Sequence, residues 1–134
     1  MSSNALLYGG IGGVLVASLI HIYIWILETF LWEKPKGLKT FRNSKEKAKI
    51  TAEMARNQGL YNLMLAINAL LGIWFLLKGH IGVGVALICA GAGSMAVAGI
   101  FLIITSPSLW KPALIQLTPP LAGVLLTLIS QGLI

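Results

Sequence analysis

The chain has 134 residues, of which 57% are hydrophobic and only 10% are charged, and its formal net charge is +6. Soluble domains contain about 25% charged residues, so this composition excludes an ordinary soluble domain and indicates an integral membrane protein. The length allows one domain, and the single cysteine, Cys89, excludes a disulfide framework or a cysteine-rich metal site within the chain.

Four apolar segments are long enough to cross a bilayer, whose hydrocarbon core of about 30 Å needs about 20 helical residues. They lie at about 5–32, 55–77, 80–104 and 112–133. A spanning segment must satisfy its backbone hydrogen bonds internally, so each is expected to be a helix, and short connections make neighbours antiparallel. The predicted fold class is therefore all-α: a polytopic membrane protein with four transmembrane helices in an antiparallel up-down bundle.

The first segment carries a polar stripe near its end. His21, Trp25, Glu28 and Trp32 share one helical face, and a rise of about 1.5 Å per residue from an interface at Trp32 puts Glu28 about 6 Å deep and His21 about 16 Å deep. A charge at the centre of a spanning helix costs about 2.5–3.5 kcal/mol, so such residues often mark ion or substrate paths. Alternatively, Glu28 snorkels or pairs with Arg56, and His21 is a neutral hydrogen-bonding group between helices.

The polar stretch at about 33–54 determines the expected topology. Seven of the ten Lys and Arg residues fall between Lys34 and Lys49, which places this loop in the cytoplasm and both termini outside. The first segment has its positive charge after it, unlike a cleaved signal peptide. The basic loop can also bind anionic lipid headgroups, at about 1 kcal/mol per residue, whereas no nucleic-acid partner is expected. Ser44 is a candidate N-cap from which the second helix begins before the membrane.

The second and fourth segments add polar groups at similar depths. Asn57, Tyr61 and Asn68 occupy nearly one face of the second helix, and Gln58 and Asn62 flank them. The fourth has Pro119-Pro120, which leaves two backbone carbonyls without their usual donors. We therefore predict a cytoplasm-facing polar pocket lined by His21, Trp25, Glu28, Asn57, Gln58, Tyr61, Asn62, Asn68 and Gln116.

Small residues recur at every fourth position in two segments, a pattern that lets helix backbones approach closely in lipid. We predict that these ladders pack helices within one chain or between the subunits of a homo-oligomer. They comprise Gly9, Gly13 and Ala17 in the first segment, and Gly82, Ala86, Ala90, Ser94 and Ala98 in the third.

Catalytic and cofactor motifs are missing from the sequence. It contains no glycine-rich phosphate loop, no Ser-His-Asp spacing and no clustered metal ligands, and His21 and His80 are predicted at different depths. No metal or cofactor is expected.

The stretch "HIYIWILETFLW" followed by "RNQGLYN" resembles the small bacterial membrane proteins of domain-of-unknown-function family 1304. The likeness covers nearly the whole chain and implies a bacterial inner-membrane protein with four helices. It supplies no activity. The matching residues are His21, Glu28 and Trp32 in the first motif, and Asn57, Gln58, Gly59, Tyr61 and Asn62 in the second.

Three functions fit these residues. The leading hypothesis is a homo-oligomeric transporter or channel-like protein for a small cation, a proton-coupled substrate or an amphiphile, with Glu28 as the acceptor and His21 as a second titratable station. The second is an accessory or structural membrane protein that binds a partner helix or lipid. The third is a membrane enzyme acting on a lipid or quinone with these two residues as acid and base, for which no nucleophile is present.

Overall fold

The computed structural model describes residues 3–134, and all regular elements in this range are helical. In chain order they are α1 (Ser3–Phe30), α2 (Pro35–Phe41), α3 (Lys45–Leu77), α4 (Ile81–Ile88), the π-helical turn η1 (Cys89–Gly93), α5 (Ser94–Thr105), the 3-10 turn η2 (Pro107–Leu109) and α6 (Trp110–Ser130). Four stretches are long and apolar enough to cross a membrane: Ser3–Phe30, Lys45–Leu77, Ile81–Thr105 and Pro107–Ser130. The prediction of an all-α membrane protein with four long helices is confirmed.

Local signals explain where the helices between the first two spans begin and end. Pro35 stands in the first turn of α2, where its missing N–H has no partner to lose. Arg42 ends α2 in the left-handed region, with φ 53°. Ser44 then caps α3, because its hydroxyl accepts a hydrogen bond of 3.2 Å from the backbone N–H of Lys47. The N-cap expected from the sequence is therefore present, whereas α2 was not anticipated.

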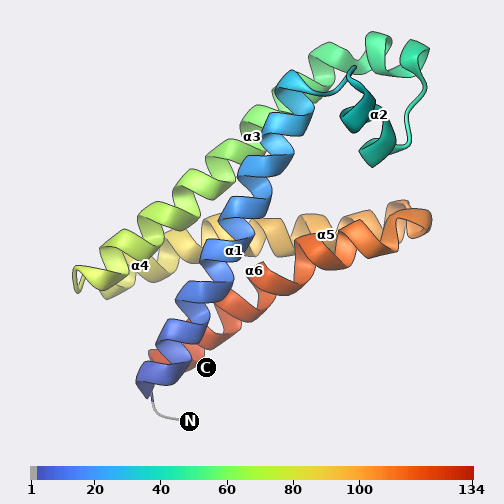
Figure 1. The fold of residues 1–134 in the computed structure, drawn as a ribbon. Coiled ribbons are helices and arrows are strands. Elements are labelled where there is room, and N and C mark those ends of the chain that lie inside the picture. Colours follow the sequence, from blue (N-terminus) through green and yellow to red (C-terminus); the bar gives the residue numbers. More distant parts are fainter. Residues whose placement is uncertain (1–2) are drawn as a thin grey trace.

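The four spans run alternately in opposite directions (Figure 1). The two ends of the described chain meet, since the Ser3 hydroxyl donates to the Ser130 carbonyl at 3.0 Å. We call this side, which also contains the turn at Lys78–His80, the terminal end, and the side with residues 31–44 the loop end. α1 packs on α3 and α6, α3 packs on α4, and α5 packs on α6. Towards the loop end the α1–α3 pair and the α5–α6 pair diverge (Figure 1).

Glycines set the closest helix crossings. A Cβ built on Gly13 would lie 2.9 Å from the Cα of Gly123, so α1 and α6 are in backbone contact. A Cβ on Gly84 would lie 2.6 Å from the backbone nitrogen of Leu76, which shows the same closeness between α4 and α3. Larger side chains at these positions would separate the helices.

The two predicted small-residue ladders have different surroundings. In α1, Ala17 is fully buried, Gly13 is half-buried and Gly9 is exposed. In the third span all five ladder residues are exposed: Gly82, Ala86, Ala90, Ser94 and Ala98. The third span instead packs within the chain through Gly84, Gly91 and Gly99. It therefore has small residues on two faces, and four-residue spacing alone could not tell which face is internal.

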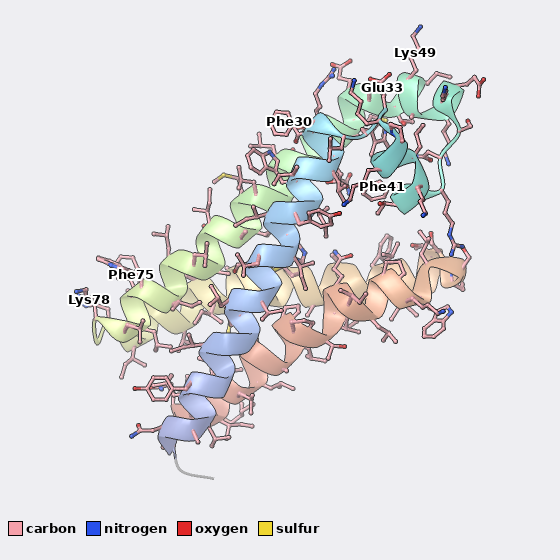
Figure 2. All side chains as sticks on the ribbon, in the orientation of Figure 1. Phe30, Glu33, Phe41, Lys49, Phe75 and Lys78 are labelled. Atoms are coloured by element: carbon pink, nitrogen blue, oxygen red, sulfur yellow. The ribbon has the colours of Figure 1, made fainter. Side chains whose placement is uncertain are left out.

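The exterior is apolar, as a lipid-embedded bundle requires. Many large hydrophobic side chains along the spans are exposed, including Phe101 and Trp74, while charged side chains gather at the ends. Lys49 points away from the bundle at the loop end and Lys78 at the opposite end (Figure 2).

Candidate functional site

Glu28 is the central residue of the polar region at the loop end. Its side chain is only 8% exposed, and its Oε2 accepts a hydrogen bond of 2.8 Å from the Nδ2 of Asn62 on α3. The two helices approach closely here because α3 has a glycine: a Cβ on Gly59 would lie 2.7 Å from the Thr29 hydroxyl and 3.2 Å from the Glu28 Cβ. The carboxylate is therefore pressed against α3 and held by one amide.

Glu28 lines three cavities and is the only one of the described residues that lines all three. The largest, which we call the central cavity, has a volume of about 350 Å³ and lies between α1, α3, α5 and α6. Its walls are Ile24, Glu28, Gln58, Asn62, Ala98, Phe101, Leu102, Thr105 and Gln116. The other two, of about 210 and 310 Å³, also share Trp32. One carboxylate is thus reached from several directions.

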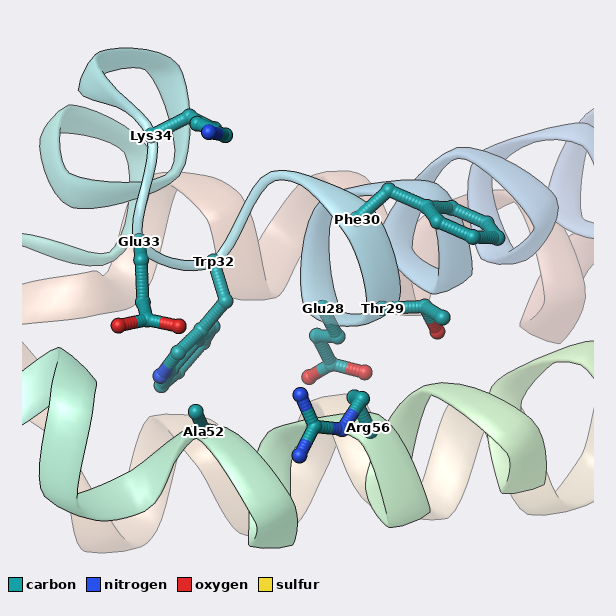
Figure 3. A pocket seen from close by; sticks show the side chains of 8 residues that line it. All are labelled: Glu28, Thr29, Phe30, Trp32, Glu33, Lys34, Ala52 and Arg56. Atoms are coloured by element: carbon teal, nitrogen blue, oxygen red, sulfur yellow. The ribbon is translucent and has the colours of Figure 1, made fainter.

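The charge of Glu28 is not neutralised by a bound basic side chain. Arg56 points towards it across the smallest cavity (Figure 3), yet within residues 3–134 the two form no ion pair. No Lys or Arg is among the residues that line the central cavity. That cavity therefore presents an anionic group together with amides, which suits a cationic ligand.

Trp32 lines both smaller cavities and attaches the loop to α3. Its indole Nε1 donates to the Ala48 carbonyl at 3.1 Å and to the Thr51 hydroxyl at 3.2 Å. Its ring packs on Phe41 of α2, with centroids 4.8 Å apart. The sequence analysis placed the membrane interface at Trp32, and the structure adds this specific attachment to the first turns of α3.

Four of the residues predicted to form a pocket do share one: Glu28, Gln58, Asn62 and Gln116 line the central cavity. Asn57 lines a different hollow on α3, together with Ile50 and Arg56, and Tyr61 is exposed. Trp25 and Asn68 are half-buried and do not line the cavities around Glu28.

The orientation of α3 explains this division. Its buried face runs through the small residues Ala55, Gly59, Ala66 and Ala69, and these pack against the bundle. The helix is therefore rotated so that Gln58 and Asn62 lie towards Glu28, and the predicted Asn57–Tyr61 face does not. The small residues were the signal in the sequence that would have identified the inner face.

His21 is buried separately from the cavities. It is 0% exposed, its Nδ1 is 2.9 Å from the Ala17 carbonyl in its own helix, and its Nε2 has no hydrogen-bond partner within residues 3–134. It does not line any of the three cavities around Glu28. The described residues contain no group of three His, Cys, Asp or Glu side chains that could hold a metal ion.

Sequence reasoning missed the wall contributed by α5. Ala98, Phe101, Leu102 and Thr105 line the central cavity from the side opposite α3. Phe101 and Leu102 are apolar residues in an apolar segment, and Ala98 was predicted only as a packing residue. The packing of α5 on α6 brings them to this cavity.

Comparison with known protein families shows which family the chain matches. Residues 15–128 match a family described as "Protein of unknown function (DUF1304)". No curated protein and no solved structure matches the chain.

Proposed function

Since the chain belongs to the DUF1304 family, whose function is unknown, we propose from its site alone that it is a small transporter. Its substrate is a small cation or a proton-coupled solute, which binds at Glu28 in the central cavity. The observation that carries this proposal is a carboxylate inside a spanning helix that lines three cavities and forms no ion pair within residues 3–134. Gln58, Asn62 and Gln116 supply the polar lining.

The Glu28 carboxylate carries an energetic cost because it lies within a spanning helix. An ionisable group within a spanning helix is expensive, by about 2.5–3.5 kcal/mol at the centre, and is usually paired or functional. Here one hydrogen bond from Asn62 offsets only part of that cost. A bound cation or a proton would offset the rest of the cost of the buried charge.

The direction of access follows from charge. Positive-inside reasoning puts the basic loop end on the cytoplasmic side of a bacterial inner membrane, with both termini outside. The α1–α3 hairpin and the α5–α6 hairpin diverge at this end (Figure 1). In this orientation the central cavity between them opens towards the cytoplasm. In this proposal the structure corresponds to an inward-facing form of a transport cycle.

Flux measurements in proteoliposomes test the proposal. We expect purified protein to carry a monovalent cation or protons across the vesicle membrane, and Glu28→Gln to abolish this flux. Glu46→Gln is the matched control, because Glu46 is an exposed carboxylate at the loop end that does not line the cavities at Glu28. Equal flux in wild type and Glu28→Gln would refute the role of Glu28.

A second candidate, an accessory membrane protein, is favoured by the exposed small-residue ladder of the third span. Its members are Gly82, Ala86, Ala90, Ser94 and Ala98, and this surface can receive a partner helix, including one from a second copy. This alternative predicts no flux in any protein and a loss of assembly on ladder substitution. Crosslinking of wild type and Ala90→Leu in native membranes tests the assembly, and the flux of the same two proteins in proteoliposomes distinguishes the two functions.

A further inference from the structure

A second, apolar hollow lies on the outer face of the third span. This outer groove has a volume of about 610 Å³ and is lined by Cys89, Gly93, Ser94, Val97, Ala98 and Phe101. Val97 and Phe101 are 65% and 64% exposed, so the groove faces outward from the bundle. Small residues form much of its floor, and no charged side chain lines it.

The outer groove and the central cavity share two wall residues. Ala98 and Phe101 line both, so the apolar hollow on the outside adjoins the polar cavity that contains Glu28. From Cys89 to Ala98 the helical rise amounts to about 14 Å. The combined site has an anionic, amide-lined end and an elongated apolar end.

This division of chemistry matches one class of ligand. A positively charged head would meet the Glu28 carboxylate and the acceptor oxygens of the nearby amides, with the Phe101 ring beside it. An unbranched hydrocarbon tail would meet only apolar and small side chains in the groove. A phosphate head would be repelled, because the central cavity lining contains a carboxylate and no Lys or Arg.

We infer that the protein binds a single-chain cationic amphiphile, such as a long-chain amine, with its head in the central cavity and its tail in the outer groove. This inference rests on the proposed function, since it names the substrate class of the Glu28 site. The tail is already in hydrocarbon when the ligand is in the bilayer, so moving it into the groove gains little hydrophobic free energy. The head therefore determines the affinity, and the groove determines the lateral route of entry from lipid.

Photolabelling of the full chain in lipid nanodiscs tests this arrangement. The probe is dodecylamine with a diazirine in its tail, and the neutral control is dodecanol with the same diazirine. We expect the amine to label residues 89–101 selectively, as located by peptide mass spectrometry, whereas the alcohol labels lipid-facing residues of all spans. Glu28→Gln should reduce the selective labelling at least about tenfold, the effect of losing one charge-assisted hydrogen bond, while Glu46→Gln should leave it unchanged.

A pair of groove variants tests the position of the tail. Ser94→Leu fills the groove at a residue that does not line the central cavity and should abolish selective labelling, whereas Ala86→Leu changes an exposed residue outside the groove and should not. Both positions are on the surface, so neither change disturbs the internal packing.

The experiments distinguish failure of this inference from failure of the proposed function. If the amine and the alcohol label the same residues while cation flux still depends on Glu28, the inference is overturned and the proposed function stands. If flux is also independent of Glu28, both are wrong. Selective labelling that survives Glu28→Gln would mean that the head binds elsewhere, which also overturns the inference.

Discussion

At the scale of single residues, the contact between Glu28 and Asn62 joins the first two spans. The carboxylate accepts from the amide at 2.8 Å, and the amide nitrogen also lies 3.3 Å from the Gln58 carbonyl of its own helix. A carboxylate with one strong donor and open cavities beside it can exchange that donor for a ligand. The Glu28–Asn62 pair therefore links the stability of the folded protein to the binding of a ligand at Glu28.

Asn62→Ala should destabilise the protein, because it leaves the largely buried Glu28 carboxylate without its donor. We expect a loss of about 1–3 kcal/mol. Thermal unfolding in detergent measures it, with Asn57→Ala as the control, since Asn57 is exposed and faces a different hollow. An equal effect of the two substitutions would show that the hydrogen bond does not contribute.

His21→Leu should leave stability unchanged or raise it by about 1 kcal/mol. The imidazole makes one hydrogen bond, between its Nδ1 and the Ala17 carbonyl of its own helix, and its buried Nε2 has no partner within residues 3–134. Removing an unsatisfied buried polar atom lowers the free energy of the folded state. The same unfolding assay measures the change. Loss of cation flux in a stable His21→Leu protein would instead support its predicted role as a second titratable station.

At the scale of helices, the third span shows how a small-residue pattern can be ambiguous. Gly82 and Gly84 are two residues apart and lie on different faces. A Cβ on Gly84 would collide with the backbone of α3, whereas a Cβ on Gly82 would meet nothing within 4 Å. The tight face fixes the bundle, and the open face is free for lipid, ligand or a partner.

Gly84→Ala should therefore destabilise the protein while Gly82→Ala should not. The added methyl group at Gly84 must push α3 and α4 apart, and overpacking of this kind costs about 1–3 kcal/mol. Unfolding temperatures of both variants in the same detergent provide the measurement. If both unfold at the temperature of wild type, α4 and α3 are not in backbone contact in the folded protein.

The sequence predicted the spans well and their rotations less well. Apolar length and the Ser44 cap are local properties, so all four spans and the early start of α3 could be read directly. The rotation of α3 about its axis depends on which residues allow a neighbouring helix to approach closely. Gly59 and Ala66 therefore face the bundle, and the predicted Asn57–Tyr61 face does not. The short helix α2 has too few residues to show a periodicity. The wall from α5 depends entirely on tertiary packing.

At the scale of the whole molecule, the two ends of the bundle differ. The terminal end is closed by the Ser3–Ser130 hydrogen bond and by the glycine crossing of α1 and α6, while the hairpins diverge at the loop end (Figure 1). A protein of this shape can close by moving one hairpin towards the other, with the terminal end as the fixed part. A transporter of the proposed kind needs such a movement.

Spin labels at Thr40 and Ser108, in a Cys89→Ser background, should report that movement. Both positions are exposed and belong to different hairpins at the loop end. We expect the distance between the labels to shorten when a transported cation is added, while labels at Asn4 and Gln131 keep their distance. Glu28→Gln should abolish the shortening. A change of equal size at both ends would indicate general loosening instead of hinge closure.

The π turn at Cys89–Gly93 has a consequence for chain length. Its hydrogen bonds span five residues instead of four, so it contains one residue more than an α-helical turn. Deleting Ala90 could convert it to an ordinary turn while Gly84 keeps its contact with α3 and Gly99 keeps its contact with α6. The same deletion in the middle of α3 would rotate all later residues by about 100° and misalign the bundle. Among relatives of this chain, single-residue gaps within the spans should therefore concentrate at this turn.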